Sequence, residues 1–159
     1  MSQALDKLKE LIKEDFKKKY PKVPEHAHPI NIFGAMNPEK REKKRIEKFC
    51  DLMGHNIVII ENRGQRKVID NSYVDAIGGE HNIKVVEWIG SGMKKGIADL
   101  QGSIKGRSVA IELKRKYKNG QDRMSQAQIE FKERQERDGG IYIIVSSFED
   151  FFNWYDEYH

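Results

Sequence analysis

Two stretches of alternating residues on either side of Lys105-Gly106 constrain the fold of this chain more than any other feature of its sequence. Apolar side chains recur at every second position within residues 97–103 and 107–116, at Ala98 and Leu100 and at Val109, Ile111 and Leu113. A period of two is typical of a β-strand that buries one of its faces. Because a two-residue turn at that dipeptide suffices to join them, the stretches are predicted to form an antiparallel hairpin.

The register of this hairpin separates an apolar face from a charged face. The turn places Leu100 opposite Ile111, and it places Asp99 opposite Glu112. Since the register and the apolar pattern agree, each supports the other. The face predicted to be apolar carries Ala98, Leu100, Val109, Ile111 and Leu113, and the other face carries Asp99, Gln101, Ala110, Glu112 and Lys114.

Asp99 and Glu112, facing each other across the hairpin, need a cation. Directly opposed residues have Cβ atoms about 5 Å apart, and like charges at that separation are destabilising. Mg²⁺ or Mn²⁺ suits the pair, because hard cations take oxygen ligands from carboxylates, water and phosphate. Lys114 shares the face of Glu112, where it could activate a water or stabilise charge on a phosphate. The alternative is a surface hairpin with a Glu-Lys ion pair.

These residues resemble the signature of the PD-(D/E)XK nucleases. The resemblance lies in Ile97-Ala98-Asp99-Leu100, a short hairpin, and Ala110-Ile111-Glu112-Leu113-Lys114, with Ala98 where many members have proline. The wider pattern, over roughly residues 39–150, resembles the VRR-NUC branch. It includes Gly92, Gly96, Gln128, Gly139-Gly140 and Val145-Ser146. Stand-alone members of this size are often phage-encoded, resemble Holliday-junction resolvases and usually act as homodimers.

The resemblance implies roles for individual residues. Asp99, Glu112 and the backbone carbonyl of Leu113 would bind the metal, and Lys114 would be the catalytic lysine. It also implies a restriction-endonuclease-like core, Mg²⁺ or Mn²⁺ as cofactor and DNA as substrate.

Further members of the site are expected from two predicted helices. Gln128 matches the family glutamine that borders the active site, and its spacing from Ser125 is also that of a capping box, so both roles are open. Family members often add a glutamate from the first core helix to the metal site. Glu42 is the preferred candidate, because it lies one turn before the buried stripe of its helix, and Glu39 and Glu47 are the alternatives.

Basic residues near the hairpin are candidates for binding nucleic acid. The chain has a formal net charge of +4 and a pI of about 9.0, with basic clusters over residues 40–48 and 114–118. A basic surface beside an acidic site suits a polyanionic substrate, and solvated surfaces are the alternative. The residues expected to contact DNA are Lys94, Lys95, Arg115, Lys116 and Lys118.

The remaining pattern predicts an α/β domain with a central mixed sheet of about four or five strands flanked by helices. An N-terminal helical arm is expected over residues 1–37 and the nuclease-like domain over residues 38–159. The apolar stripe of the arm is expected to pack on the core or against a second copy of the chain. Helices are predicted over residues 2–20, 38–53 and 125–138 and from Ser147 onward. Strands are predicted over residues 56–61, 83–88 and 141–145, with a polar turn region before residue 83.

The sequence as a whole predicts a metal-dependent enzyme that cleaves DNA, first of all branched DNA and next duplex or flap DNA. A non-catalytic binding module with the same fold, a restriction-type enzyme and an RNA nuclease remain as alternatives. Cys50 is the only cysteine, which excludes an internal disulfide and favours a cytoplasmic location, in the host cell if the chain is phage-encoded. The apolar runs are too short to span a membrane.

Overall fold

The computed structural model describes residues 2–27, 32–61, 65–74, 80–89, 95–114, 116–117, 120–121 and 123–158. For residues 65–74, 80–89, 116–117 and 120–121 it describes the backbone alone. The chain forms two compact units, one made of Met1–Ile60 with Gly96–His159 and the other of Glu61–Lys95.

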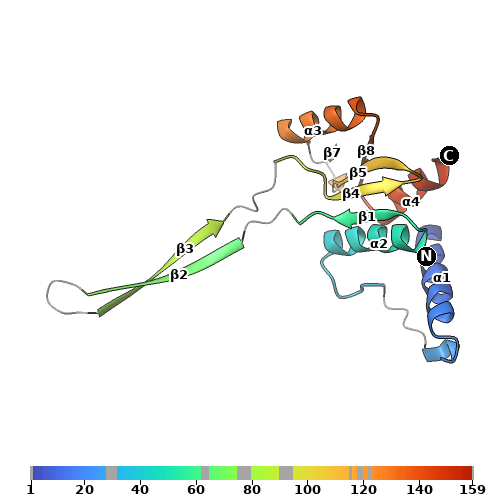
Figure 1. The fold of residues 1–159 in the computed structure, drawn as a ribbon, viewed down its shortest axis with the longest axis horizontal. Helices are drawn as coiled ribbons and strands as arrows, with labels where there is room; N and C mark the ends of the chain where they lie inside the picture. The colour runs from blue at the N-terminus through green and yellow to red at the C-terminus, as the bar shows by residue number, and fades with distance from the viewer. Residues whose placement is uncertain are drawn as a thin grey trace. The chain divides into compact units, whose positions relative to one another are not determined.

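A mixed sheet of four strands forms the centre of the larger unit (Figure 1). Its strands are β1 (Asn56–Ile59), β4 (Leu100–Ile104), β5 (Arg107–Leu113) and β8 (Ile141–Val145), in the order β1-β4-β5-β8. The pairs β1–β4 and β4–β5 are antiparallel, and β5–β8 is parallel. This arrangement confirms the predicted α/β class with a central mixed sheet.

The hairpin of β4 and β5 has the predicted turn and register. Leu100 pairs with Ile111, and Ile104 pairs with Arg107. The turn residues Lys105 and Gly106 have φ angles of 50° and 80°. Positive φ at both central residues is the requirement of a type I′ turn, whose twist matches that of the two strands.

The alternation predicted for this hairpin is wrong at its open end. The β4–β5 ladder stops at Leu100, and Asp99 lies in a bend instead of pairing with Glu112. Because the backbone bends there, Ala98 does not join Leu100 on the apolar face. It packs instead with Ala110, on the face that was predicted to be polar.

Within the described residues, four α-helices flank the sheet. They are α1 (Gln3–Lys19), α2 (Pro38–Leu52), α3 (Gln126–Arg137) and α4 (Phe148–Glu157), and a short 3-10 turn, η1 (Glu25–Ala27), follows α1. No helix in these ranges is long and apolar enough to cross a membrane.

Side-chain caps begin three of these helices. Asn37 accepts a hydrogen bond from the Glu39 N–H at the start of α2, directly before Pro38. Ser125 and Gln128 form a complete capping box at the start of α3, which confirms one of the two roles expected for Gln128. Ser147 accepts a hydrogen bond from the Asp150 N–H and caps α4.

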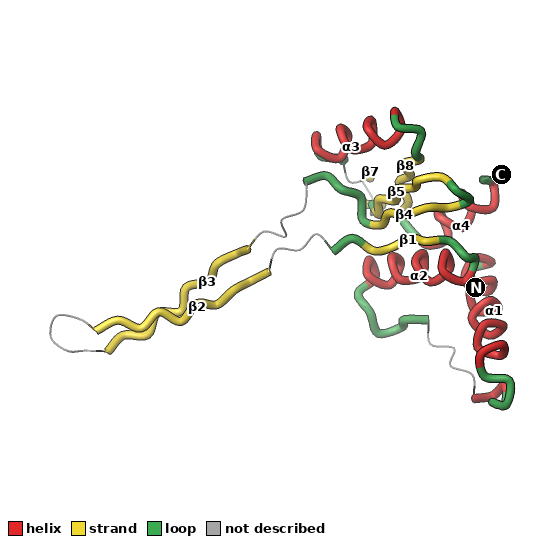
Figure 2. The backbone as a smooth tube through the Cα atoms, in the orientation of Figure 1, coloured by secondary structure: helices red, strands yellow, loops and turns green. Residues whose placement is uncertain are grey.

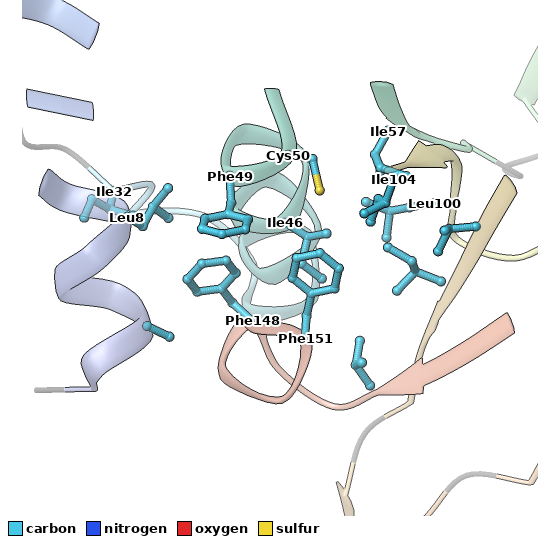
Figure 3. Close-up of a cluster of buried hydrophobic side chains, with 14 residues drawn as sticks. Leu8, Ile32, Ile46, Phe49, Cys50, Ile57, Leu100, Ile104, Phe148 and Phe151 are labelled. Carbon is cyan, nitrogen blue, oxygen red and sulfur yellow. The ribbon is translucent and has the colours of Figure 1, made fainter. Parts of the chain in front are cut away.

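The main core lies between one face of the sheet and the helices α1, α2 and α4 (Figure 3). Phe49 of α2 is at its centre and makes edge-on contacts with four aromatic rings of α4, those of Phe148, Phe151, Phe152 and Tyr155. Cys50 is fully buried beside it, and burial raises the pKa of its thiol to about 12.

A smaller apolar cluster lies on the opposite face of the sheet. Ala98, Ala110 and Tyr142 form it, and Met124 and Phe131 from the segment around α3 pack against it. Figure 2 shows α3 on the side of the sheet away from α2. The sheet is therefore covered by helices on both faces, and β5 is buried between the two clusters.

The N-terminal helix is part of the main core. Ala4 and Leu8 of α1 are buried in it, and α1 packs against α2 and α4. Of the two places considered for its apolar stripe, the structure puts it on the core of its own chain. The boundary expected after residue 37 does not separate compact units in this structure.

The smaller unit contains a long antiparallel hairpin of β2 (Gln65–Val74) and β3 (Glu80–Ile89). The strand predicted over residues 83–88 lies within β3, but β2 falls where a polar turn region was expected. The polar run Asp70-Asn71-Ser72 interrupts the apolar pattern of β2, whose residues are all paired with β3. In the larger unit, β6 (Lys116–Tyr117) and β7 (Gly120–Gln121) form a further short ladder.

Replacing Phe49 with alanine should lower the free energy of unfolding by about 3–5 kcal/mol, because the cavity would remove contacts with the aromatic rings of α4. Urea unfolding followed by circular dichroism would measure this change. Met53→Ala, at the exposed end of the same helix, is the control and should cost less than about 1 kcal/mol. Equal losses in the two variants would contradict the central place of Phe49 in the core.

Candidate active site

Four polar side chains from different elements meet at the open end of the β4–β5 hairpin. Glu112 comes from β5, Asp99 precedes β4, Lys114 follows β5, and Gln128 lies in the first turn of α3. The structure thus brings together the four residues that were predicted to act in catalysis. Lys43 of α2 joins them through Asp99.

Glu112 is the only charged residue that is buried among the described side chains, with 5% of its surface exposed. It lies on the face of β5 that carries the smaller cluster, opposite the main core. The Gln128 amide Nε2 donates a hydrogen bond of 2.5 Å to Glu112 Oε1, and Lys114 Nζ lies 3.3 Å from the same oxygen. Glu112 is therefore held by two polar neighbours on one of its oxygens.

Gln128 links these groups to the start of α3. Its Oε1 accepts hydrogen bonds from Lys114 Nζ at 3.2 Å and from the Ser125 N–H at 2.9 Å. Gln128 thus caps the helix with its oxygen while its nitrogen holds Glu112. The capping role left open by the sequence is confirmed, and the contact with Glu112 places Gln128 in the candidate site.

The approach of α3 to the site depends on Gly96. This residue has a φ of 85°, and a Cβ at this position would lie 2.3 Å from the Ala127 carbonyl carbon and oxygen. The absence of a side chain lets the first turn of α3 pack against the chain just before Asp99. Gln128 is held beside the acidic pair in this way.

Asp99 is fixed by its backbone and by both of its carboxylate oxygens. Its carbonyl oxygen accepts a hydrogen bond from the Ile60 N–H, which extends the contact between β1 and β4 by one residue. Oδ2 accepts a hydrogen bond of 3.0 Å from the Leu113 N–H, and Oδ1 lies 2.6 Å from Lys43 Nζ. The bend that breaks the ladder therefore turns the side chain of Asp99 toward the end of β5.

The surroundings of Glu112 oppose the ionisation of its carboxyl group. Burial raises the pKa of Glu112, and the negative charge of Asp99 raises it further, while Lys114 and Lys43 act in the opposite direction. The net pKa lies above the ordinary value for a glutamate. A site of this kind favours a bound cation, because the cation would offset both the burial and the repulsion.

The oxygen donors of this site fit a hard divalent cation. Asp99 and Glu112 offer carboxylates, and the half-buried Leu113, which lies between Glu112 and Lys114 in the sequence, offers a backbone carbonyl. Mg²⁺ and Mn²⁺ use few protein ligands when water and phosphate complete the shell. Within the described ranges, no three His, Cys, Asp or Glu side chains are grouped to hold a metal.

The three glutamates considered on α2 have different partners. Glu42 accepts hydrogen bonds from the Phe148 N–H and from Arg45, so it serves the start of α4. Glu47 accepts one from the Ile59 N–H on the outer edge of β1. Glu39 lies 2.8 Å from Lys43 Nζ and is thereby linked to Asp99. The preferred candidate, Glu42, thus has both oxygens occupied by protein donors.

A small pocket lies beside these residues. It has a volume of about 140 Å³. Its walls are formed by Pro38, Glu39, Glu42, Leu113, Lys114 and Ser146. The start of α2 and the end of β5 therefore border the same pocket, and Lys114 forms part of its wall.

Two residues of the site were not singled out from the sequence. Lys43 was grouped with the basic cluster over residues 40–48, and its spacing from Glu39 gives no sign of the contact with Asp99. Tyr142 of β8 packs on the face that carries Glu112, and its hydroxyl has no hydrogen-bond partner among the described residues. Burial, with the charges of Glu112 and Asp99, raises the pKa of this phenol.

The basic residues expected to bind nucleic acid are only partly described. Lys94, Arg115 and Lys118 lie outside the described residues, and Lys116 is described by its backbone in β6 alone. Lys95 is exposed and belongs to the smaller compact unit. Their role in DNA binding stays a prediction.

Comparison of the chain with protein-family models, with curated proteins and with solved structures finds no match. The case for a function therefore rests on the residues of this site and on their geometry.

Replacing Glu112 with glutamine should stabilise the metal-free protein at neutral pH. Because the folded-state pKa of Glu112 is raised, ionising it costs stability as the pH rises from the ordinary glutamate value through the raised one. Glutamine keeps the acceptor for Gln128 without this cost. The Tm of Glu112→Gln in EDTA should exceed that of wild type at pH 7, and the difference should disappear below about pH 4.

Thermal unfolding followed over a series of pH values would measure this difference. Glu133→Gln, an exposed residue on α3, is the control and should give no such pH-dependent gain. A wild-type protein that is the more stable of the two at pH 7 would show that the burial of the charge is fully compensated.

Proposed function

We propose that this chain is a metal-dependent nuclease of the PD-(D/E)XK type, from the VRR-NUC branch, with a restriction-endonuclease-like core. The observation that carries the proposal is the buried Glu112, placed beside Asp99 and 3.3 Å from Lys114. An acidic pair and a lysine in one partly enclosed site suit phosphodiester hydrolysis, and a surface ion pair would not be buried in this way.

The acidic groups would hold the metal. Asp99, Glu112 and the Leu113 carbonyl are the protein ligands proposed for Mg²⁺ or Mn²⁺, in keeping with the resemblance seen in the sequence. When bound, such a cation polarises a phosphoryl oxygen and lowers the pKa of a bound water. Glu39, linked to Asp99 through Lys43, replaces Glu42 as the helix glutamate best placed to support this group.

Lys114 and Gln128 would act on the reacting groups. Lys114 carries a positive charge at the edge of the pocket, where it stabilises the charge that develops on the phosphate and orients the attacking water. Gln128 holds Lys114 and Glu112 at fixed positions through its amide. Since Gln128 is also the cap of α3, its side chain is ordered before substrate binds.

DNA is the proposed substrate, with branched DNA first and ordinary duplex or flap DNA next. Two copies of the chain would act together as a homodimer, as the resemblance to junction resolvases implies. A binding module without activity is the main alternative, and the intact set of Asp99, Glu112 and Lys114 argues against it.

Cleavage of labelled branched, duplex and single-stranded DNA, and of RNA, in Mg²⁺ or Mn²⁺ tests this proposal. Asp99→Ala and Lys114→Ala should each lower the rate of cleavage by about 100-fold or more, since a metal ligand or a charge-stabilising group would be lost. Lys132→Ala is the control, because Lys132 pairs only with Glu136 on the outside of α3 in the described contacts.

Binding without cleavage in either metal, by a wild-type protein that is folded, would contradict the proposal for the DNA structures in the panel. Cleavage confined to RNA would keep the catalytic site and change the substrate. Cleavage that survives in both variants would remove Asp99 and Lys114 from the chemistry.

A further inference from the structure

We propose that Lys43 occupies the cation position beside Asp99 in the metal-free protein and must leave Asp99 when a divalent cation binds. Lys43 would then set the affinity of the site for the cation. This inference rests on the metal site of the proposed function and deepens it.

The position of the Lys43 ammonium is the first observation. Nζ lies 2.6 Å from Asp99 Oδ1 and 2.8 Å from Glu39 Oε1, so two carboxylates share one positive charge. The side chain of Lys43 is 13% exposed. The Lys43 ammonium is held by two carboxylates and is mostly shielded from water. It therefore occupies the position that a metal ion bound to Asp99 would take.

The second observation is how the two carboxylate oxygens of Asp99 are used. Its Oδ2 already accepts the Leu113 N–H, which belongs to the end of β5. Oδ1 faces the Lys43 ammonium instead of the backbone, so it is the oxygen at which a divalent cation and Lys43 would compete. A divalent cation and the ammonium could not share this oxygen closely, because two positive charges at such a separation repel each other.

The side chain of Lys43 is suited to such an exchange. Its four-carbon chain can swing the charge away without moving the helix. Glu39, one turn earlier on α2, stays as a partner for the ammonium after it leaves Asp99. The contact with Asp99 is thus replaceable, whereas the position of α2 is fixed by Ile46 and Phe49 in the core.

The affinity for Mn²⁺, measured by isothermal titration calorimetry without DNA at one fixed pH, tests this inference. Lys43→Met removes the competing charge and should tighten Mn²⁺ binding by about tenfold, the size expected for the loss of one charge-assisted hydrogen bond. Lys44→Met is the matched control, since Lys44 pairs with Glu47 on the same helix, and its affinity should equal that of wild type.

A second pair of variants separates the exchange from a change in folding. Lys43→Gln keeps a hydrogen-bond donor but not the charge, and it should tighten binding in the same direction. In an Asp99→Asn background, Lys43→Met should no longer change the affinity, because the contested oxygen has lost its charge. Thermal unfolding in EDTA reports whether each variant is folded, and Lys43→Gln decides the result if Lys43→Met is not.

An unchanged or weaker affinity for Mn²⁺ in the folded Lys43 variants would overturn the inference. If wild type also cleaves DNA with Mn²⁺, the nuclease proposal stands and only the role of Lys43 falls. If neither wild type nor the Lys43 variants bind Mn²⁺, the metal site and this inference fail together.

Discussion

The antiparallel pairing of β4 with β5 determines where the polar groups of the candidate site can lie. The tight turn at Lys105-Gly106 fixes the register, and the register brings the start of β4 to the end of β5. At that open end the chain bends, so that Asp99 leaves the ladder and binds the Leu113 N–H with its side chain. The neighbouring Glu112 remains in the sheet and is buried.

The burial of Glu112 beside a second carboxylate is costly, and the surrounding elements supply the groups that offset it. Lys43 and Lys114 bring positive charge, and Gln128 donates a hydrogen bond. The helices lie on opposite faces of the sheet, with α2 on the main core and α3 on the smaller cluster. The site forms where side chains from both faces of the sheet reach the same end of the hairpin. Because elements from both faces surround this end, Glu112 is shielded from water while a pocket remains beside Lys114.

Several parts of the fold follow from short-range patterns in the sequence. The hairpin register, the turn at Lys105-Gly106 and the capping box of Ser125 and Gln128 depend on residues a few positions apart. The register also brings Asp99 toward Glu112, but the predicted pairing of the two was wrong because the chain bends at Asp99. The strand β2 did not follow, because its polar residues break the alternation and its order comes from pairing with β3.

The sequence by itself determined the α/β pattern, the hairpin and the types of residue at its open end, because periodicity and local hydrogen bonds are written in neighbouring positions. Only the tertiary structure decided which partners the charged side chains of α2 take. Lys43 meets Asp99, 56 positions away, and Glu42 meets the backbone of Phe148, 106 positions away. In the sequence, the charged residues of α2 form one continuous polar surface with no sign of their partners. The packing of α2 against the sheet and α4 determines which partner each of them contacts.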